Sequence, residues 1–349
     1  MMNKNFKFIY MYTNSMNMSM LMMLLFSTYM AITSMSWLNS WIFLEMNMMT
    51  FIPLMINKSK LNKSTNSMIK YFIVQSFSSS FLLLSFIILN FSMMNEIFKI
   101  NYLMKIMISI ALMIKLGMTP FHWWMPHIMI KLNWKNCLLL LTWQKLIPLI
   151  LLYQINENFL MNLCAMMSMI FGSIMGMNQT SIKLLMTYSS INHIGWIIIN
   201  MLMNKFLMML YFLIYSLTNM IICLMMNNMN IIYMNQLFKN FNKNQFNKMF
   251  LMMMILSMGG LPPLLGFFPK MISFIMTLKN FMLMESMIMI FTTLITLKFY
   301  MNLMLPMLNI YSMKIKFSNS KYYINEMNYS LIINMMLSFM MMTMINYLP

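Results

Sequence analysis

The chain lacks arginine and aspartate altogether, and it has little charge of any kind. Of its 349 residues only 8% are charged, all of them lysine or glutamate, whereas 61% are hydrophobic and the mean hydropathy is +0.72. A soluble protein carries roughly 25% charged residues, so this composition excludes a soluble globular domain. The net charge of +18 does not indicate nucleic-acid binding, because such proteins concentrate basic residues on a solvated domain. We expect a membrane protein that binds no nucleic acid.

Cysteine is also scarce, and none of the three cysteines stands in a CxxC spacing. Cys137, Cys164 and Cys223 lie singly within or beside apolar stretches, which argues against a disulfide framework, a zinc site and an iron–sulfur cluster. The glycine fingerprint that follows a strand in nicotinamide-binding folds is missing as well. We therefore expect no cofactor and no metal in this chain.

Two further features of composition indicate no site. The 61 methionines could supply thioethers to a soft metal such as Cu(I), but they are spread through every apolar segment in the places of leucine and isoleucine. The N-terminus has Lys4 and Lys7 but no arginine-rich amphipathic run and no small-residue cleavage site, so we expect no removable targeting segment.

Apolar stretches long enough to cross a bilayer, about 20 residues each, fill most of the chain. They are continuously apolar, without the two-residue alternation of barrel strands, and so predict helices. The connections are too short for an extramembrane domain. We predict one all-α polytopic membrane domain, residues 1–349. Its eleven candidate spans are approximately 14–35, 37–56, 69–92, 103–125, 137–154, 160–177, 184–203, 206–226, 249–270, 282–303 and 329–347.

The lysines of the connections divide unequally between the two sides of the membrane. The side of the N-terminus receives fifteen: Lys4, Lys7, Lys58, Lys60, Lys63, Lys70, Lys131, Lys135, Lys183, Lys239, Lys243, Lys248, Lys314, Lys316 and Lys321. The opposite side receives four: Lys99, Lys105, Lys205 and Lys279. Because lysine accumulates on the cytoplasm-like side, the N-terminus is predicted on that side, the matrix in a mitochondrion.

Five charged side chains within predicted spans are candidates for a functional role: Glu45, Lys115, Lys145, Lys270 and Lys298. A charge at the centre of a span costs about 2.5–3.5 kcal/mol or more, and by default it marks a pathway or a paired site. Glu45 is the one acid deep within a span. We interpret it as the partner of a buried lysine, because pairing lowers the desolvation cost of both groups. A protonated carboxyl bonded to a neighbouring helix is the alternative.

Three of these lysines stand near a proline, which frees the helical carbonyl four residues earlier. A freed carbonyl within hydrocarbon needs protein, water or a polar side chain beside it. Burial penalises the charged form of lysine, so a buried lysine can exchange its proton when neighbouring charges change. Proton relay is thus favoured over chemistry on an organic substrate. The sets are Lys115, Pro120 and Leu116; Lys145, Pro148 and Gln144; and Lys270, Pro269 and Leu265.

Lys298 lies near the end of its span without a neighbouring proline, and we expect it to snorkel to the interface. Snorkelling is also the alternative for Lys115, for Lys145 and for Lys270, the last residue of the predicted span 249–270.

The three histidines differ in their surroundings. His122 follows Lys115 by seven residues, a spacing that places both on one face of a helix. His193 lies mid-span in TYSSINHIGW, where a titratable relay role is plausible, and His127 directly follows Pro126, which suggests an interfacial position.

At this point six segments, in order and at similar spacing, resemble the subunit 2 family of mitochondrial NADH dehydrogenase, antiporter-like membrane subunits of respiratory complex I. The resemblance covers residues 37–300, and LTWQKLxP and GGLPPxxGFxPK are its strongest motifs. The segments are WIFLEMNMMTFIPLM, IKYFIVQ, KLGMTPFHWWMP, LLLLTWQKLIP, GMNQTSIKLLMTYSSINHIGW and GGLPPLLGFFPK.

The resemblance implies two inverted five-helix repeats, 14–154 and 160–303, each with a broken fourth helix, followed by a loop and an extra helix over 304–349. It implies that Glu45 pairs with Lys115, and that Lys145 and Lys270 belong to the same buried polar axis.

The implied function is proton translocation in the mitochondrial inner membrane, coupled to electron transfer from NADH to ubiquinone. FMN, the iron–sulfur clusters and both substrates would belong to other subunits of the complex. The expected partners are the other membrane-arm subunits and the lipid bilayer, including cardiolipin.

The chain departs from the family pattern at Asn66 and at His127, where many relatives have glutamate. Acidic residues found in some relatives just after the lysine of GFxPK are also missing. These differences bear on contacts at the matrix side and with other subunits. Two other functions stay open: a stand-alone cation/proton antiporter, which would share the lysine pairs, and a structural membrane spacer.

Overall fold

The computed structural model describes residues 2–56, 61–94, 98–155, 158–239, 245–262 and 264–314. Apart from an isolated bridge between Ser181 and Tyr233, the regular structure of this part is helical, which confirms the predicted all-α class. The predicted span 329–347 lies outside the described residues. Within the described residues, six helices are long and apolar enough to cross a membrane: Met16–Thr33, Ser64–Phe91, Trp134–Ile155, Asn158–Met177, Lys205–Met229 and Leu283–Leu305.

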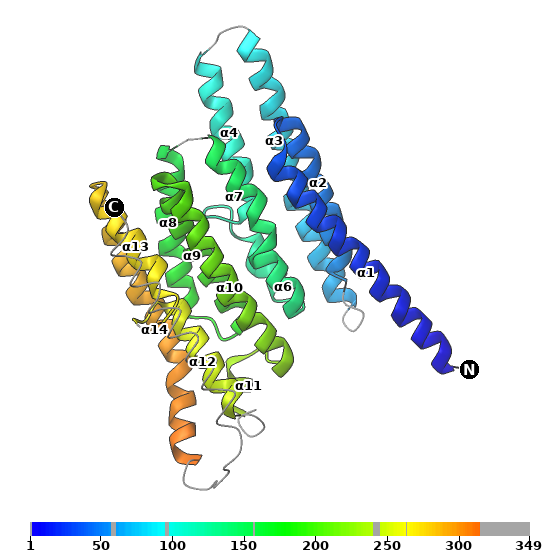
Figure 1. Ribbon diagram of the computed structural model, residues 1–349, viewed down its shortest axis with the longest axis vertical. Coiled ribbons are helices and arrows are strands. Elements are labelled where there is room, and N and C mark those ends of the chain that lie inside the picture. Colours follow the sequence, from blue (N-terminus) through cyan, green and yellow to red (C-terminus); the bar gives the residue numbers. More distant parts are fainter. Residues whose placement is uncertain are drawn as a thin grey trace. The chain divides into compact units, whose positions relative to one another are not determined.

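The chain divides into two compact units. Met1–Gly117 with Phe121–Leu160 form the first, and Met118–Pro120 with Met161–Pro349 form the second. In the first unit α1 packs against α2, α2 against α3, α3 against α4, and α4 against α7, and Figure 1 shows α3 and α4 as a long hairpin. Its helices are α1 (Met2–Thr33), α2 (Trp37–Leu54), α3 (Leu61–Met94), α4 (Phe98–Leu116), α5 (Trp124–Met129), α6 (Trp134–Leu141) and α7 (Trp143–Ile155).

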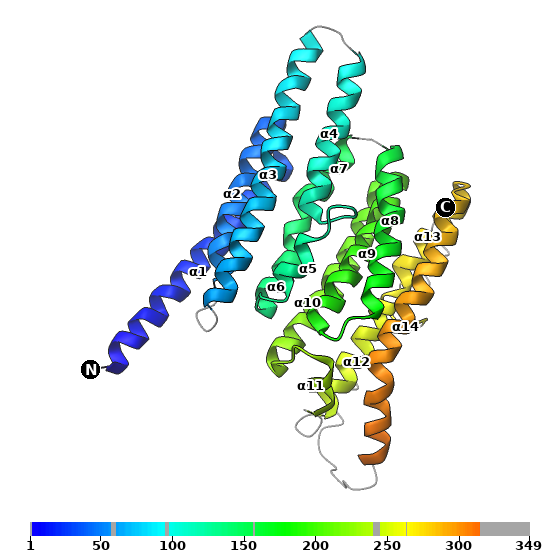
Figure 2. The same ribbon diagram turned by 180° about the vertical axis from the view of Figure 1, so that it is seen from behind.

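In the second unit α10 packs against α9, α12 and α13, and α14 packs against α12 and α13. Figure 2 shows α13 and α14 side by side. The helices are α8 (Asn158–Met177, of which the last seventeen residues belong to this unit), α9 (Ile182–Met203), α10 (Lys205–Met229), α11 (Met234–Lys239), α12 (Gln245–Gly259), α13 (Phe267–Lys279) and α14 (Leu283–Lys314).

Helices α8 and α9 approach each other through two glycines. A Cβ added to Gly172 of α8 would lie 2.7 Å from the backbone nitrogen of Asn192, and one added to Gly195 of α9 would lie 2.5 Å from Oγ of Ser168. Small residues let membrane helices pack at backbone distance, where dispersion replaces the missing hydrophobic drive. This packing positions the part of α9 that carries His193.

Two predicted spans are broken instead of continuous. The span 103–125 leaves its helix at Gly117, which has φ +70°, and the span 249–270 leaves α12 at Gly260, which has φ +85°. Glycine adopts this left-handed region without a Cβ clash. The second broken span resumes as α13 and continues to Lys279, so the predicted end at residue 270 was too early. Lys270 therefore lies within a helix and not at its terminus.

Helix ends near these breaks have carbonyls that need donors, because the last carbonyls of a helix lack intrahelical partners. The indole Nε1 of Trp124 donates to the Ile114 carbonyl at the end of α4 (3.0 Å), and the amide of Asn136 donates to the Leu54 carbonyl at the end of α2 (2.7 Å). The hydroxyl of Thr142 donates to the Leu138 carbonyl (2.7 Å) where α6 gives way to α7. Side chains thus complete the backbone hydrogen bonding where the helices stop.

We expect Gly172→Ala to destabilise the protein by about 1–3 kcal/mol, the usual cost of overpacking a well-packed core. The new methyl group would meet backbone atoms of α9, which cannot move without separating the two helices. The measurement is thermal unfolding of the detergent-solubilised protein.

Gly176→Ala, one turn along the same helix, is the matched control, because its methyl group would meet the ring of Phe299 at 3.2 Å. Equal losses of stability in the two variants would contradict the close α8–α9 contact.

Candidate functional site

Lys115 and Lys145 line the same small cavity in the first unit. Lys115 comes from the last turn of α4 and Lys145 from the first turn of α7, and their side chains are only 7% and 2% exposed. The cavity has a volume of about 20 Å³, room for about one water molecule. Lys145 therefore does not snorkel to the surface.

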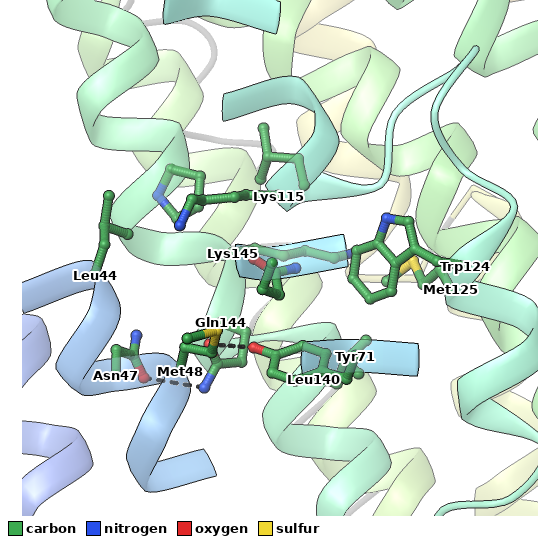
Figure 3. A pocket seen from close by; sticks show the side chains of 13 residues that line it. Leu44, Asn47, Met48, Tyr71, Lys115, Trp124, Met125, Leu140, Gln144 and Lys145 are labelled. Atoms are coloured by element: carbon green, nitrogen blue, oxygen red, sulfur yellow. Dashed lines mark hydrogen bonds between the residues drawn. The ribbon is translucent and has the colours of Figure 1, made fainter. Parts of the chain in front are cut away.

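A chain of three polar side chains forms another part of the cavity wall (Figure 3). The hydroxyl of Tyr71 donates to Oε1 of Gln144 (3.3 Å), and Nε2 of Gln144 donates to Oδ1 of Asn47 (3.0 Å). These residues come from α3, α7 and α2, so three helices contribute to one network. A water in this cavity would have the two to four polar partners that a buried water needs.

Glu45 lies on α2, two residues before Asn47, and its side chain is half-buried. Its carboxylate interacts electrostatically with the ammonium of Lys115. The structure therefore places the acid of α2 within the electrostatic range of the lysine at the end of α4.

His122 does not lie on a helical face with Lys115, as the seven-residue spacing predicted. The chain leaves the helix at Gly117, so the residues between them do not follow the helical period. His122 is buried and stacks against Trp123 at 5.0 Å. The positions near the lysines are taken by Trp124 and Met125, which line the cavity.

Lys270 in the second unit is held by the end of the broken helix. Its side chain is 6% exposed, and Nζ donates to the carbonyls of Gly259 (2.8 Å) and Met258 (3.0 Å). The sequence predicted that Pro269 frees the Leu265 carbonyl, four residues earlier in the chain. That expectation was wrong, because Pro269 lies in the first turn of α13, where its missing N–H costs no helical hydrogen bond.

The two hydrogen bonds on Lys270 balance only part of the cost of burying it. A hydrogen bond to a charged group contributes about 1.5–3 kcal/mol, and burying an ion costs several kcal/mol. The Nζ atom also lies 6.0 Å from the ring centroid of Trp196, at the outer limit of a cation–π contact. This balance favours a lysine that can lose its proton or gain a counter-charge.

Two glycines make room for this arrangement. A Cβ on Gly260 would lie 2.9 Å from Cδ of Lys270, and a Cβ on Gly266 would lie 1.7 Å from the carbonyl oxygen of Ser257. Only glycine fits where the chain between α12 and α13 folds back on the end of α12. The motif GGLPPLLGFFPK thus encodes both the lysine and the space that the lysine occupies.

His193 lies in the middle of α9, is 5% exposed and has a tyrosine partner on α10. Its Nδ1 and the hydroxyl of Tyr211 lie 2.9 Å apart, and the ring of Tyr215 lies 5.1 Å from its own. A cavity of about 10 Å³ joins these groups to Met258, whose carbonyl accepts from Lys270. The histidine and the lysine of the second unit therefore share Met258, at the end of α12, as a neighbour.

The remaining candidates are at the surface of the units. Lys298 and His127 are exposed.

Sequence reasoning missed several polar residues that the structure buries. Tyr211 could have been found from its position four residues before Tyr215, one turn along the same helical face. Lys183, assigned to a connection, is 5% exposed at the start of α9. Glu285, treated as a span end, is 8% exposed, and the amide of Asn162 donates to its Oε1 (2.5 Å).

The sequence of this chain matches those of a known protein family. Residues 34–296 match the family model described as NADH:quinone oxidoreductase/Mrp antiporter, TM. NADH-ubiquinone oxidoreductase chain 2 of Anopheles gambiae is 43% identical over 288 residues, which cover 81% of this chain and 83% of that protein. The protein of the same name from Oryctolagus cuniculus is 36% identical over 321 residues, 88% of this chain and 92% of the relative.

Solved structures share the fold at low sequence identity. A chain of respiratory complex I from Thermus thermophilus with bound Aureothin aligns with a TM-score of 0.77 at 17% identity, covering 93% of this chain and 76% of that one. A chain of the Mrp complex from Dietzia aligns with a TM-score of 0.70 at 14% identity, covering 82% and 59%.

We expect Gln144→Met to destabilise the first unit by about 1–3 kcal/mol, because it leaves Oδ1 of the buried Asn47 without its donor. Combined with Tyr71→Phe, the loss should be smaller than the sum of the single losses by about 0.5 kcal/mol or more, since the two side chains share a hydrogen bond. Thermal unfolding of the four forms measures this coupling.

Gln154→Met on the exposed face of α7 is the control and should leave the unfolding midpoint unchanged. Additive losses from Tyr71→Phe and Gln144→Met would show that the chain of polar side chains does not act as a unit.

Proposed function

The chain belongs to the NADH:quinone oxidoreductase/Mrp antiporter family of membrane proteins, and we propose that it serves as the subunit-2 membrane component of mitochondrial NADH:ubiquinone oxidoreductase, complex I. Its part in that enzyme is proton translocation, coupled to electron transfer in other subunits. The observation that carries this proposal is the polar cavity shared by Lys115 and Lys145, because two buried lysines beside room for one water can exchange a proton.

In the first unit the proton carriers are Glu45, Lys115 and Lys145. When Lys115 is protonated, the carboxylate of Glu45 stabilises it, and when that attraction weakens, the proton can pass through the cavity to Lys145. The chain formed by Tyr71 and Gln144 orients the cavity wall and can bind the transferring water.

In the second unit the carriers are His193 and Lys270. The Met258 and Gly259 carbonyls favour the ammonium form of Lys270, and desolvation opposes it, so a nearby charge can shift the balance. The hydroxyl of Tyr211 can exchange a proton with His193 because the two polar atoms lie within hydrogen-bond distance.

A stand-alone cation/proton antiporter is the alternative that shares these lysines. The names of the curated relatives, which describe chain 2 of an oxidoreductase and share 36–43% identity with this chain, favour the complex I subunit.

We further propose that this chain holds no redox group. NADH, FMN, the iron–sulfur clusters and ubiquinone would bind to other subunits. In support, the described residues contain no group of three or more metal-ligating side chains. Its partners would be the other membrane-arm subunits and the lipid bilayer, and the many flanking lysines suit an anionic lipid such as cardiolipin.

The chain is a multi-pass mitochondrial membrane protein, by its apolar helices and its animal relatives, and we propose the inner membrane. The two compact units, which divide at residue 160, would correspond to the five-helix repeats 14–154 and 160–303, with the loop and helix of 304–349 following them.

Lys145→Met and Lys270→Met should each lower the rate of proton translocation by about tenfold or more, since a positioned proton-transfer group contributes roughly 10²–10⁴-fold. The loss should appear either as fewer protons moved per NADH oxidised or as slower NADH oxidation. Methionine keeps an unbranched apolar stem and removes only the titrating amine. The measurement is proton uptake into vesicles that contain the assembled enzyme, together with the rate of NADH oxidation in the same vesicles.

Lys298→Met is the matched control, because Lys298 is an exposed lysine of the same chain and should pump normally. Normal pumping by Lys145→Met or Lys270→Met in an assembled enzyme would contradict the proton relay and would show that the chain acts as a structural spacer.

The lysine distribution predicts that the N-terminus faces the matrix. An epitope tag placed at the N-terminus should survive protease in mitoplasts with an intact inner membrane and be digested once detergent is added. Digestion before detergent would reverse the proposed orientation.

A further inference from the structure

A cavity of about 330 Å³ lies beside Lys270, between the α12–α13 break and α14. Its volume falls within the range of small-molecule sites, about 300–1,000 Å³. It is much larger than the two small cavities already described, which have volumes of about 20 and 10 Å³. The proton-transfer roles proposed above leave this space unused.

The walls of this cavity are largely apolar, with Lys270 and Thr293 as polar lining residues. Phe274 of α13 and Met289 and Leu297 of α14 form much of the lining, whereas Lys270 contributes the charge. Ile290, which also lines the cavity, is 41% exposed, and Pro262 at the same cavity is exposed too. The cavity therefore opens toward the outside of the unit along a helix that carries apolar residues on its exposed face.

Lys270 has no acidic partner within the described part of the second unit. Glu285 is the one acidic side chain there, and its carboxylate accepts from Asn162. Lysine has three N–H donors, two of which go to the carbonyls of Met258 and Gly259, and the described residues offer no partner to the third. A buried ammonium normally has a counter-charge, and here the space next to it is a cavity.

We propose that this cavity binds the carboxylate end of a long-chain fatty acid drawn from the membrane. The carboxylate accepts a hydrogen bond from Lys270 and balances its charge, and the alkyl chain runs past Phe274 and Met289 to the opening at Ile290. One cation in the wall of a largely apolar cavity matches one anionic group on an apolar chain, in both charge and polarity.

The depth of Lys270 favours a fatty acid over a phospholipid. Lys270 lies nine residues before the end of α13, roughly 13 Å along the helix axis, which is nearly half of the ~30 Å hydrocarbon core. A phospholipid headgroup must stay at the interface with both of its acyl chains, whereas a single carboxylate on one chain can enter. The site thus selects monocarboxylates.

The experiment uses the assembled enzyme in its purified form and a palmitic acid that carries a photoreactive diazirine on its alkyl chain. After irradiation, mass spectrometry should find the label on peptides of α13 and α14. Unlabelled palmitate should compete at least about tenfold better than methyl palmitate, the factor expected from one hydrogen bond to a charged group.

Ile290→Trp should reduce this labelling about fivefold or more, because the larger ring fills the opening of a cavity near the lower size limit. Leu294→Trp is the matched control: Leu294 lies one turn further on α14, is 59% exposed and does not line the cavity, so labelling should persist. If Ile290→Trp does not assemble, the competition between palmitate and its methyl ester in the unmodified enzyme decides the matter.

Equal competition by palmitate and methyl palmitate would overturn the proposal, since it would show that no carboxylate is recognised. Labelling of the same peptides by a photoreactive phosphatidylcholine, with none by the fatty acid, would assign the cavity to a phospholipid. Absence of all lipid labelling, with a cross-link from the cavity to another protein segment, would assign it to protein.

Discussion

Backbone carbonyls that lose their helical partners inside a membrane need donors, and this constraint organises the whole protein. The donors are side chains brought from elsewhere in the fold: the indole of Trp124 for Ile114, the amide of Asn136 for Leu54, and the ammonium of Lys270 for Met258 and Gly259. Because hydrocarbon supplies no hydrogen bonds, each of these helix ends relies on a polar side chain. Lys115, Lys145 and Lys270 lie beside breaks, whereas Glu45 and His193 lie within helices.

The two units stabilise their buried lysines by different means. Lys115 has an acid, Glu45, within electrostatic range and a polar cavity at its side, whereas Lys270 depends on two carbonyls and has a largely apolar cavity beside it. An acid can change its own charge, and carbonyls cannot. In the proposed relay the first lysine would exchange its proton beside a fixed acid, and the second would exchange its proton with water, His193 or a bound carboxylate.

Several details of the site were open to prediction from local sequence, and others were not. The breaks were signalled by proline and glycine next to lysine, and burial of Lys145 followed from its place in the middle of an apolar run. The alignment of His122 with Lys115 failed, because one glycine with a positive φ ended the helical period. The carbonyl freed by Pro269 was also misjudged, because counting back from proline assumes that the helix continues through it, and here α13 begins just before Pro269.

The sequence by itself determined that this is a polytopic helical membrane protein with charged residues at interrupted helices, because hydropathy and proline act over a few neighbouring residues. Only the tertiary structure decided which side chains meet. It brought Asn47, Tyr71 and Gln144 together from three helices and turned Lys270 back onto the end of α12. Such contacts depend on how far each helix rotates and where it stops, and a helix rotates by about 100° with every residue. A single residue in a break therefore changes every face that follows it.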